Sequence, residues 1–342
     1  MRLDLKKVSM YLADKVGCGY YRLVSPGMLL EERASFNVKQ MDFFSEYAFH
    51  WSDICVFQRC YSDKLLKTFK DLQNKGKVVV YELDDDIFNV SKNSPAYATF
   101  HKSNHLDSAK SLISAANLVT CSTESLKNVL LNYNNNVEVL PNSLDFRLWP
   151  RPQKEKVSFK NEVRLGWFGS PTHFEDLQFI IPVLERLLES NLPLKIIFFG
   201  YIPLNFKRFS GKVEFVEGVA FPEFRKVLTN LGIDIGLAPV KDTAFNHSKS
   251  NLKYLEFSAV RAVTVASNCL PYNDTVIHGV NGYLADNNNP DEWVKIITDL
   301  VNDETKRKEI SNNAYNLVFS NFNIYKNYKL WEDAYKRNLN VV

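Results

Sequence analysis

The chain has 342 residues, about twice the length of a typical single domain, so two domains are expected. Hydrophobic residues make up 45% of the chain and charged residues 24%, so each half can bury an ordinary core. The net charge of +3 argues against a strongly basic body that would hold nucleic acid through its phosphates, although local basic patches are compatible with it.

Neither a secretion signal nor a membrane-spanning segment is expected. Charges interrupt residues 1–16, where a signal peptide would be apolar. No run approaches the ~18 apolar residues that a transmembrane helix requires. The five cysteines are odd in number and lack a C-x-x-C pair, which is typical of reduced thiols. The sequence therefore predicts a cytoplasmic protein without a disulfide framework or a zinc site.

Two successions of strands and helices are separated by a Pro-rich, charged linker over residues 149–161. Apolar, β-rich runs predict strands at 7–12, 53–59, 77–83, 117–122 and 137–140 before the linker, and at 163–169, 194–199, 213–216, 233–239 and 263–266 after it. Helices are expected at 65–73, 179–188 and 222–231, and an aromatic-rich helical segment at 310–339. This alternation predicts a parallel, doubly wound sheet in each half, with ligands at the carboxyl ends of the strands.

A glycine-containing segment, residues 17–22 (GCGYYR), follows the first predicted strand. A glycine turn here would let the backbone approach a ligand, with Arg22 available for an anion. The segment lacks the third glycine of the dinucleotide fingerprint, and a tight turn without a ligand is the plain alternative. Asp14 lies just ahead of this segment, where an acid–base role stands beside that of a capping or surface aspartate.

Three consecutive aspartates, residues 84–86, follow the strand predicted at 77–83. Carboxylates at a strand's carboxyl end lie where open α/β sheets bind ligands. A cation site is one interpretation, because hard cations prefer oxygen ligands. Capping of a helix by one aspartate, with the other two solvated, is another.

The segment 246–284 carries the strongest chemical signal. Asn246 and Ser248 are favourable N-cap residues, and a helix is expected to follow them. Lys249, Lys253 and Glu256 would share one face of that helix. A helix N-terminus with lysines suits a phosphate, and a carboxylate further along suits sugar hydroxyls. Alternatively, Lys253 and Glu256 form an ordinary solvated pair.

The pattern K-S-x-x-K-x-x-E-x-x-A, followed by V-x-V-A-S, P-Y and G-V-x-G-Y-L, resembles the donor-binding segment of family 4 retaining glycosyltransferases, in particular their bacterial and phage surface-glycan branch. The resemblance implies a GT-B fold, in which two Rossmann-like, doubly wound domains face each other across a cleft. An acceptor-side domain would span 1–150 and a nucleotide-sugar-binding domain 151–320. A C-terminal helix, 321–342, would return to the first domain.

The resemblance also suggests roles for individual residues. The catalytic groups would be Lys249, Lys253, Glu256 and Asp85, with Glu256 holding the nucleotide ribose. The first glutamate of the family's E-x7-E pair falls on Ser248. The Arg and Lys that many family members carry near residues 169–173 are absent, and Lys249 and Lys253 are candidates to replace those two basic residues. Donor contacts are expected from Gly17, Gly19, Arg22, Gly169, Ser170, Thr172, His173, Tyr201, Gly218, Val219, Ser248 and Ser250, and acceptor-side contacts from Asp14, Tyr20, Tyr21, Asp84 and Asp86.

The implied reaction is sugar transfer, with retention, from a nucleotide-diphosphate sugar, most simply a UDP-sugar, without a required metal or cofactor. The expected acceptor is a growing surface glycan or its lipid carrier, which leaves peripheral attachment to the inner membrane face open. Two alternatives stand beside it: a phage enzyme that glycosylates a hydroxymethylated DNA base, and a non-catalytic protein that binds a nucleotide sugar or a glycan. The oligomeric state is not predicted.

Overall fold

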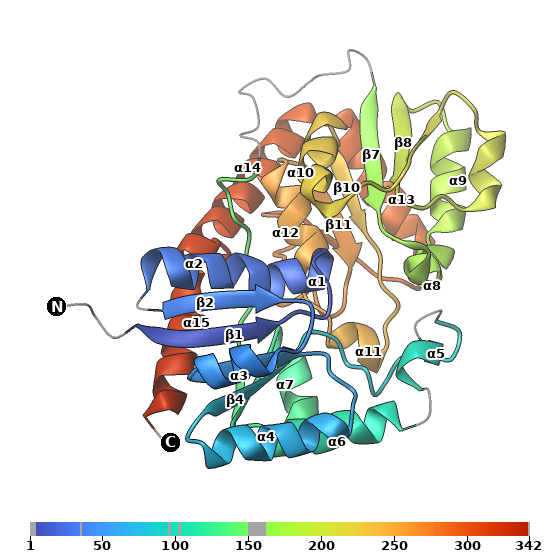
Figure 1. Ribbon diagram of the computed structural model, residues 1–342. Coiled ribbons are helices and arrows are strands. Elements are labelled where there is room, and N and C mark those ends of the chain that lie inside the picture. The colour runs from blue at the N-terminus through green and yellow to red at the C-terminus, as the bar shows by residue number, and fades with distance from the viewer. Residues whose placement is uncertain (1–4, 35, 95–96, 102–103, 150–161, 341–342) are drawn as a thin grey trace. The chain divides into compact units, whose positions relative to one another are not determined.

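The structure is a computed structural model that describes residues 5–34, 36–94, 97–101, 104–149 and 162–340 (Figure 1). The chain divides into two compact units. Unit 1 comprises residues 1–144, 248–250 and 323–342, and unit 2 comprises 145–247 and 251–322. Nearly all of the linker predicted over 149–161, and the predicted boundary at 150, lie outside the described residues.

Unit 1 contains a six-stranded parallel sheet in the order β2-β1-β3-β4-β5-β6. Every residue of the central strands β3 and β4 is buried, because helices cover both faces of the sheet. The edge strand β2 was not predicted. The strands are β1 (Lys6–Tyr11), β2 (Phe36–Met41), β3 (Ile54–Gln58), β4 (Val78–Leu83), β5 (Leu118–Cys121) and β6 (Val137–Val139).

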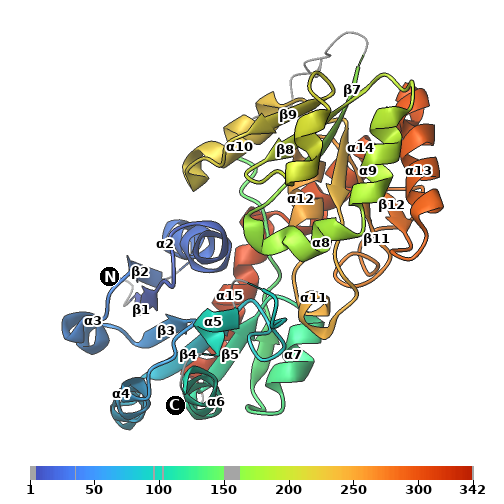
Figure 2. The same cartoon turned by 90° about the vertical axis from the view of Figure 1, so that its right-hand side faces the viewer.

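The helices of unit 1 form two layers around this sheet. Apolar residues of α2 and α15 pack on one face, and those of α4, α6 and α7 pack on the other (Figures 1 and 2). Trp331 and Tyr335 place α15 in the first of these cores, although it comes last in the chain. The helices are α2 (Ser25–Arg33), α3 (Glu46–Trp51), α4 (Lys64–Asn74), α5 (Tyr97–Phe100), α6 (His105–Ala115), α7 (Glu124–Leu130) and α15 (Ile324–Leu339).

The prediction of a glycine turn at residues 17–22 is wrong. These residues are helical: α1 (Gly17–Gly19) continues into the π-helical segment η1 (Tyr20–Val24) and then into α2. The aromatic segment predicted as one helix over 310–339 is likewise divided, because α14 ends at Asn321 and α15 begins at Ile324. Asn323 caps the second helix, its side chain accepting a hydrogen bond from the backbone N–H of Tyr325.

Unit 2 contains a second six-stranded parallel sheet, in the order β12-β11-β10-β7-β8-β9. Its strands are β7 (Val163–Phe168), β8 (Leu194–Phe199), β9 (Val213–Val216), β10 (Ile235–Ala238), β11 (Val263–Ser267) and β12 (Tyr283–Ala285). The longer helices are α9 (Ile181–Glu189), α10 (Phe221–Asn230), α12 (Leu252–Ala259), α13 (Pro290–Asn302) and α14 (Glu304–Asn321), and short ones are η2 (Pro171–His173), α8 (Phe174–Gln178), η3 (Leu204–Arg208) and α11 (Ala244–His247).

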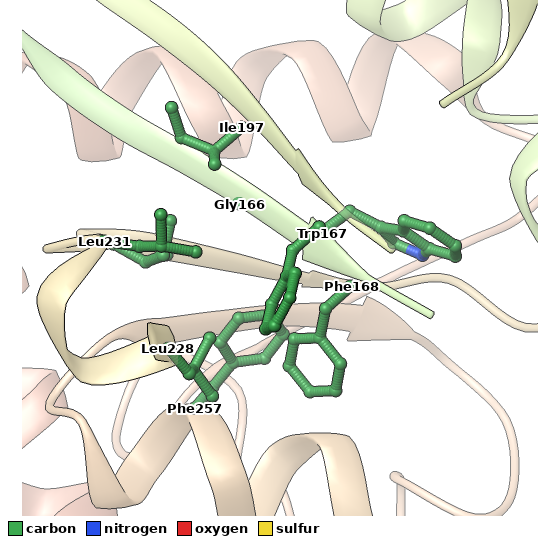
Figure 3. A pocket seen from close by; sticks show the side chains of 9 residues that line it. Gly166, Trp167, Phe168, Ile197, Leu228, Leu231 and Phe257 are labelled. Atoms are coloured by element: carbon green, nitrogen blue, oxygen red, sulfur yellow. The ribbon is translucent and has the colours of Figure 1, made fainter. Parts of the chain in front are cut away.

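Helix α12 is held close to the sheet of unit 2. A methyl group at Gly236 of β10 would lie 2.3 Å from the Phe257 ring, so glycine is required for this approach. A small crevice between β7, β8, α10 and α12 has the apolar lining shown in Figure 3, which includes Phe168, Leu228 and Phe257. This lining offers no set of polar groups for a nucleotide, so we regard the crevice as part of the core. Among the described residues, no helix has the length and apolar character needed to cross a bilayer.

Candidate functional site

Three glycines line the carboxyl edge of the unit 2 sheet. Gly169 and Gly200 directly follow β7 and β8, and Gly218 comes two residues after β9. Gly200 has a φ of +94°, and a methyl group there would lie 2.6 Å from the Gly169 carbonyl oxygen. A methyl group at Gly218 would contact the Gly200 Cα at 3.7 Å. The three glycines therefore let the backbones of these loops pack closely side by side, and we call this arrangement the glycine row.

Lys253 reaches this row from the first turn of α12. Its Nζ lies 5.7 Å from the ring centroids of both Trp167 and Phe168, the last residues of β7. The Trp167 ring packs against Gly169, where an added methyl group would lie 2.8 Å from it. Lys253 therefore supplies positive charge beside the glycine row. Glu256 lies about one turn further along α12 and is only 4% exposed.

His173 belongs to the same edge. A methyl group at Gly169 would meet its Cδ2 at 3.3 Å, so the imidazole lies against the loop that follows β7. Nδ1 lies 3.0 Å from Oδ2 of Asp176, a residue that is 5% exposed. The other oxygen of Asp176 accepts hydrogen bonds from the Lys241 backbone N–H (3.0 Å) and the Asn246 side-chain amide (2.9 Å). A buried carboxylate thus fixes the orientation of a partly exposed imidazole.

The other candidates in unit 2 lie around this edge. Ser170 and Thr172 are exposed, and their hydroxyl oxygens are 2.6 Å apart. The Tyr201 ring meets the Trp167 ring edge to face, with their centroids 6.4 Å apart. Val219 follows Gly218 and is 40% exposed. The structure therefore brings Gly169, Ser170, Thr172, His173, Tyr201 and Lys253 together, with Gly218 reaching the row through Gly200.

The prediction that Lys249, Lys253 and Glu256 share one helical face is wrong. Asn246 lies within α11, and α12 begins only at Leu252 with Asn251 as its N-cap residue. Neither Asn246 nor Ser248 is therefore the N-cap of α12, and Lys249 precedes that helix. Residues 248–250 cluster with unit 1. There the Thr123 hydroxyl donates to the Ser248 carbonyl (2.9 Å), and the Asn142 amide donates to Ser250 Oγ (2.8 Å).

Arg22 is a fully buried member of the unit 1 core. Its Nε donates to Glu82 Oε1 at 2.6 Å, and Nη1 donates to Asn142 Oδ1 at 3.1 Å and to the Leu140 carbonyl. Burial raises the pKa of Glu82, and the Arg22 charge opposes that rise. The expectation of an Arg22 side chain available to an anion is therefore corrected: its donors are directed into the protein.

Arg59 organises the aspartates that follow β4. It has a φ of +48°, and its guanidinium donates to Asp84 at 2.6 Å, to Asp85 at 2.7 Å and to Cys18 Sγ at 3.3 Å. Burial acts to raise the pKa of Asp84, but the charges of Arg59 and Arg22, together with hydrogen bonds from Cys18 and Arg59, outweigh burial and lower it. Burial and the Asp84 charge raise the pKa of Asp85, against the effects of Arg59 and Lys249. The two carboxyl groups thus have pKa values displaced in opposite directions.

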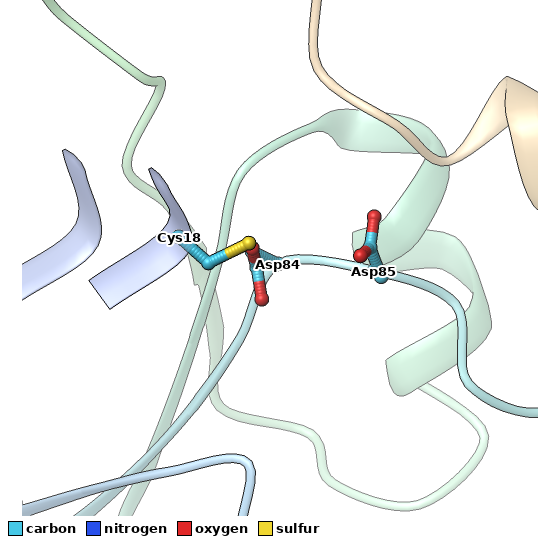
Figure 4. Close-up of side chains that lie close together, drawn as sticks. All are labelled: Cys18, Asp84 and Asp85. Atoms are coloured by element: carbon cyan, nitrogen blue, oxygen red, sulfur yellow. The ribbon is translucent and has the colours of Figure 1, made fainter. Parts of the chain in front are cut away.

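The chemistry of this cluster does not suit a cation. Cys18, Asp84 and Asp85 offer ligand atoms within 4.8 Å of one another, and Figure 4 shows the Asp84 carboxylate beside the Cys18 sulfur. Arg59 already compensates both carboxylates. Burial raises the pKa of the Cys18 thiol well above its ordinary value, so a cation would have to displace the thiol proton before the sulfur could act as a ligand.

The remaining acceptor-side candidates have local structural partners. Asp14 Oδ1 accepts hydrogen bonds from the backbone N–H groups of Val16 and Gly19, both at 3.0 Å, so it caps α1. Asp86 accepts from the Phe88 N–H (3.1 Å) and the Asn89 amide (2.7 Å), which stabilises a turn. The rings of Tyr20 and Tyr21 meet edge to face, and Tyr21 is buried. Their expected contacts with an acceptor stay predictions.

Comparison with known proteins gives this architecture a precedent. The structure aligns with that of sucrose-phosphate synthase from Thermosynechococcus elongatus at a TM-score of 0.74 and 10% identity, over 99% of this chain and 100% of that one. It aligns with HepE of Anabaena, solved in complex with UDP and glucose, at a TM-score of 0.67 and 16% identity, over 97% and 100%. The fold is GT-B.

Two sequence matches accompany the GT-B fold. Residues 252–317 match the family model of glycosyl transferases group 1. An uncharacterized glycosyltransferase of Methanocaldococcus jannaschii is 23% identical over 202 residues, which is 55% of this chain and 48% of that protein. The chain thus spans about half the length of this curated relative. The family match begins at Leu252, the first residue of α12.

Two side chains that hold candidate site residues in place, Asp176 and Arg59, were not predicted from the sequence. Asp176 was not singled out, although it lies three residues after His173, a spacing at which side chains meet in a helical turn. Arg59 was included only as the last residue of the strand predicted at 53–59. Its role depends on pairing with residues 84 and 85, and the parallel register of β3 and β4 brings these positions together.

Proposed function

We propose that this protein is a glycosyltransferase that moves a sugar, with retention, from a nucleotide-diphosphate donor to a surface glycan or its lipid carrier in the cytoplasm. The observation that carries the proposal is the position of α12. The match to glycosyl transferases group 1 starts at this helix, and its Lys253 lies at the glycine row of unit 2. The structure of HepE with UDP and glucose supports a uridine nucleotide as donor.

The carboxyl edge of unit 2 has the properties that a nucleotide diphosphate requires. The phosphates would lie along the row formed by Gly169, Gly200 and Gly218, where these three residues add no side chains of their own between a ligand and the backbone N–H groups. Lys253 stabilises the negative charge that develops on the leaving diphosphate, which is the main electrostatic demand of the reaction. Glu256 accepts hydrogen bonds from the ribose hydroxyls.

Unit 1 supplies the acceptor side in this proposal. The side chain of Asp85 is 28% exposed, and Arg59 holds it in place. Burial and the Asp84 charge raise its pKa, so it can accept a hydrogen bond or a proton from an attacking hydroxyl more readily than Asp84 can. Lys249 acts from the same unit, because its segment is anchored to Thr123 and Asn142.

The test is a thermal-shift panel of UDP, ADP, GDP and UDP-sugars on the full-length chain. A ligand that binds only the folded state stabilises it by about 2.7 kcal/mol at 100 times its Kd. We expect UDP to raise the melting temperature of the wild type and of Lys295→Ala, which removes an exposed lysine of α13. Lys253→Ala should lose most of the shift. Asp85→Asn should keep it but lower the rate of sugar transfer at least tenfold, about 1.4 kcal/mol.

The results of this panel distinguish a glycosyltransferase from a protein that only binds a nucleotide sugar. A folded wild type that no nucleotide diphosphate stabilises would reject the proposal. Stabilisation by UDP without transfer to any glycan, lipid-linked glycan or hydroxymethylated DNA would instead indicate a nucleotide-sugar-binding protein. Comparing initial rates with and without EDTA would decide whether transfer needs a metal.

A further inference from the structure

We propose that Asp176 is a positioning residue that holds His173 to bind a phosphate of the nucleotide donor through Nε2. The inference rests on the proposed function, because it names a second charged group of the same donor site. It assigns Asp176 a role in donor binding and gives His173 a specific ligand, a phosphate oxygen.

The His173 ring lies at the edge of the sheet where the donor is proposed to bind. The ring lies against Gly169, the first member of the glycine row, so a ligand that uses the row passes along the imidazole. Its side chain is 27% exposed, whereas that of Asp176 is 7% exposed. The imidazole can therefore reach both the ligand and the protein interior, and Asp176 can reach only the interior.

Asp176 is itself held in place by several hydrogen bonds. Its Oδ1 accepts two hydrogen bonds, from the Lys241 backbone at 3.0 Å and from the Asn246 amide at 2.9 Å. The Asn246 amide also donates to the Lys241 carbonyl at 3.0 Å, which ties the same loop together. Oδ2 faces His173 Nδ1 at 3.0 Å. An imidazole whose Nδ1 donates to such a carboxylate has a fixed ring orientation and presents Nε2 away from it.

The charges of the neighbouring groups also suit a phosphate. Lys253, at the same edge, already favours an anion. Glu175, the other acidic residue of α8, lies 3.8 Å from the Lys241 ammonium, which offsets its charge. A phosphate oxygen accepts hydrogen bonds and does not donate them, so a ring that meets it through Nε2 carries a proton on both nitrogens. Asp176 compensates that positive charge, and the bond to phosphate becomes charge-assisted.

The experiment compares UDP and uridine binding by isothermal titration to the wild type, His173→Gln, Asp176→Asn and the double variant. His173→Gln leaves Asp176 in place, and Asp176→Asn keeps the shape of the side chain but removes its charge. Each single variant should bind UDP about tenfold or more weakly, as expected for the loss of a charge-assisted hydrogen bond. Uridine affinity should stay unchanged, because uridine has no phosphate. The double variant should be no weaker than His173→Gln, since Asp176 acts through His173.

The chain offers a matched control in Asp242→Asn. Asp242 pairs with His247 in the same unit, but that aspartate is 67% exposed and the histidine 36%. We expect this variant to bind UDP like the wild type. Wild-type UDP affinity in Asp176→Asn would overturn the inference while leaving the proposed function intact. So would an equal loss of uridine binding, which would indicate a structural role, or additive losses in the double variant. A wild type that binds no nucleoside diphosphate would overturn both.

Discussion

Replacing Gly19 by alanine should destabilise unit 1 strongly, whereas the same change at Gly17 should not. A methyl group at Gly19 would lie 1.8 Å from the Asp14 carbonyl oxygen, while one at Gly17 would meet nothing within 4 Å. The contact at Gly19 is with backbone, so either the start of α1 or the loop before it has to move. That movement breaks the hydrogen bonds from the Val16 and Gly19 N–H groups to Asp14.

The magnitude follows from these two effects. Overpacking costs about 1–3 kcal/mol, and each lost hydrogen bond adds about 1 kcal/mol, so the free energy of unfolding should fall by about 3–5 kcal/mol. At about 2–4 °C per kcal/mol for a unit of this size, the melting temperature should fall by about 10 °C. Gly17→Ala should be neutral or stabilising by up to about 1 kcal/mol.

The assay is thermal unfolding of the two variants and the wild type, with and without UDP. Equal melting temperatures for Gly19→Ala and Gly17→Ala would refute the steric reasoning. If Gly19→Ala were instead fully stable but bound UDP weakly, the expected ligand contact at this glycine would be favoured over a structural requirement.

Two further predictions concern buried polar groups of unit 1. Glu82→Gln should lower the free energy of unfolding in urea by about 3–5 kcal/mol, because it leaves the Arg22 guanidinium buried without its counter-charge. Glu304→Gln, which breaks an exposed pair with Lys308, should have a much smaller effect. Equal losses in the two variants would contradict this reasoning. Burial raises the pKa of the Cys60 thiol to about 12. The unfolded chain releases this proton near its ordinary pKa of 9.0, whereas the folded chain keeps it until the pH approaches 12. The stabilisation is therefore fully present below pH 9.0 and is lost as the pH rises, so the free energy of unfolding should be lower by about 1.4 kcal/mol at about pH 10. Urea unfolding at about pH 8 and pH 10 should show a smaller decrease in the free energy of unfolding for Cys60→Ala than for the wild type. An identical decrease in both proteins would show that the Cys60 thiol does not cause this pH dependence.

The fold could be predicted in outline because parallel strands buried on both faces read as apolar runs. The residues of β3, β4, β7 and β11 are all buried, and each strand overlaps a predicted run. Strand β2 was not predicted because it is an edge strand with one exposed and three partly exposed residues. Its sequence therefore shows neither a continuous apolar run nor a regular alternation of apolar and polar residues. Residues 17–22 were misread because glycine usually signals a turn, whereas here Gly19 is needed for close packing inside a helical segment.

The candidate site was predictable where residue type and strand ends coincide. Gly169 was a candidate through the resemblance to family 4 glycosyltransferases, and Lys253 through that resemblance and its expected place on a helical face; the structure places both at the carboxyl edge of the unit 2 sheet. Partners that depend on tertiary structure could not be chosen. The sequence gives no sign that Arg22 is buried opposite Glu82, 60 residues away, or that residues 248–250 belong to unit 1.

The membership of α15 in unit 1 has a consequence for biosynthesis. Trp331 and Tyr335 complete the core formed by β1, β3 and α2, but the ribosome makes them only after all of unit 2. At ~5–20 residues per second, the strands of unit 1 therefore wait for about 10–40 s with one apolar face covered by α2 but not yet by α15. Unit 2 can complete its core in that interval, so the nascent chain should depend on a chaperone at the open face of unit 1 until its last helix emerges.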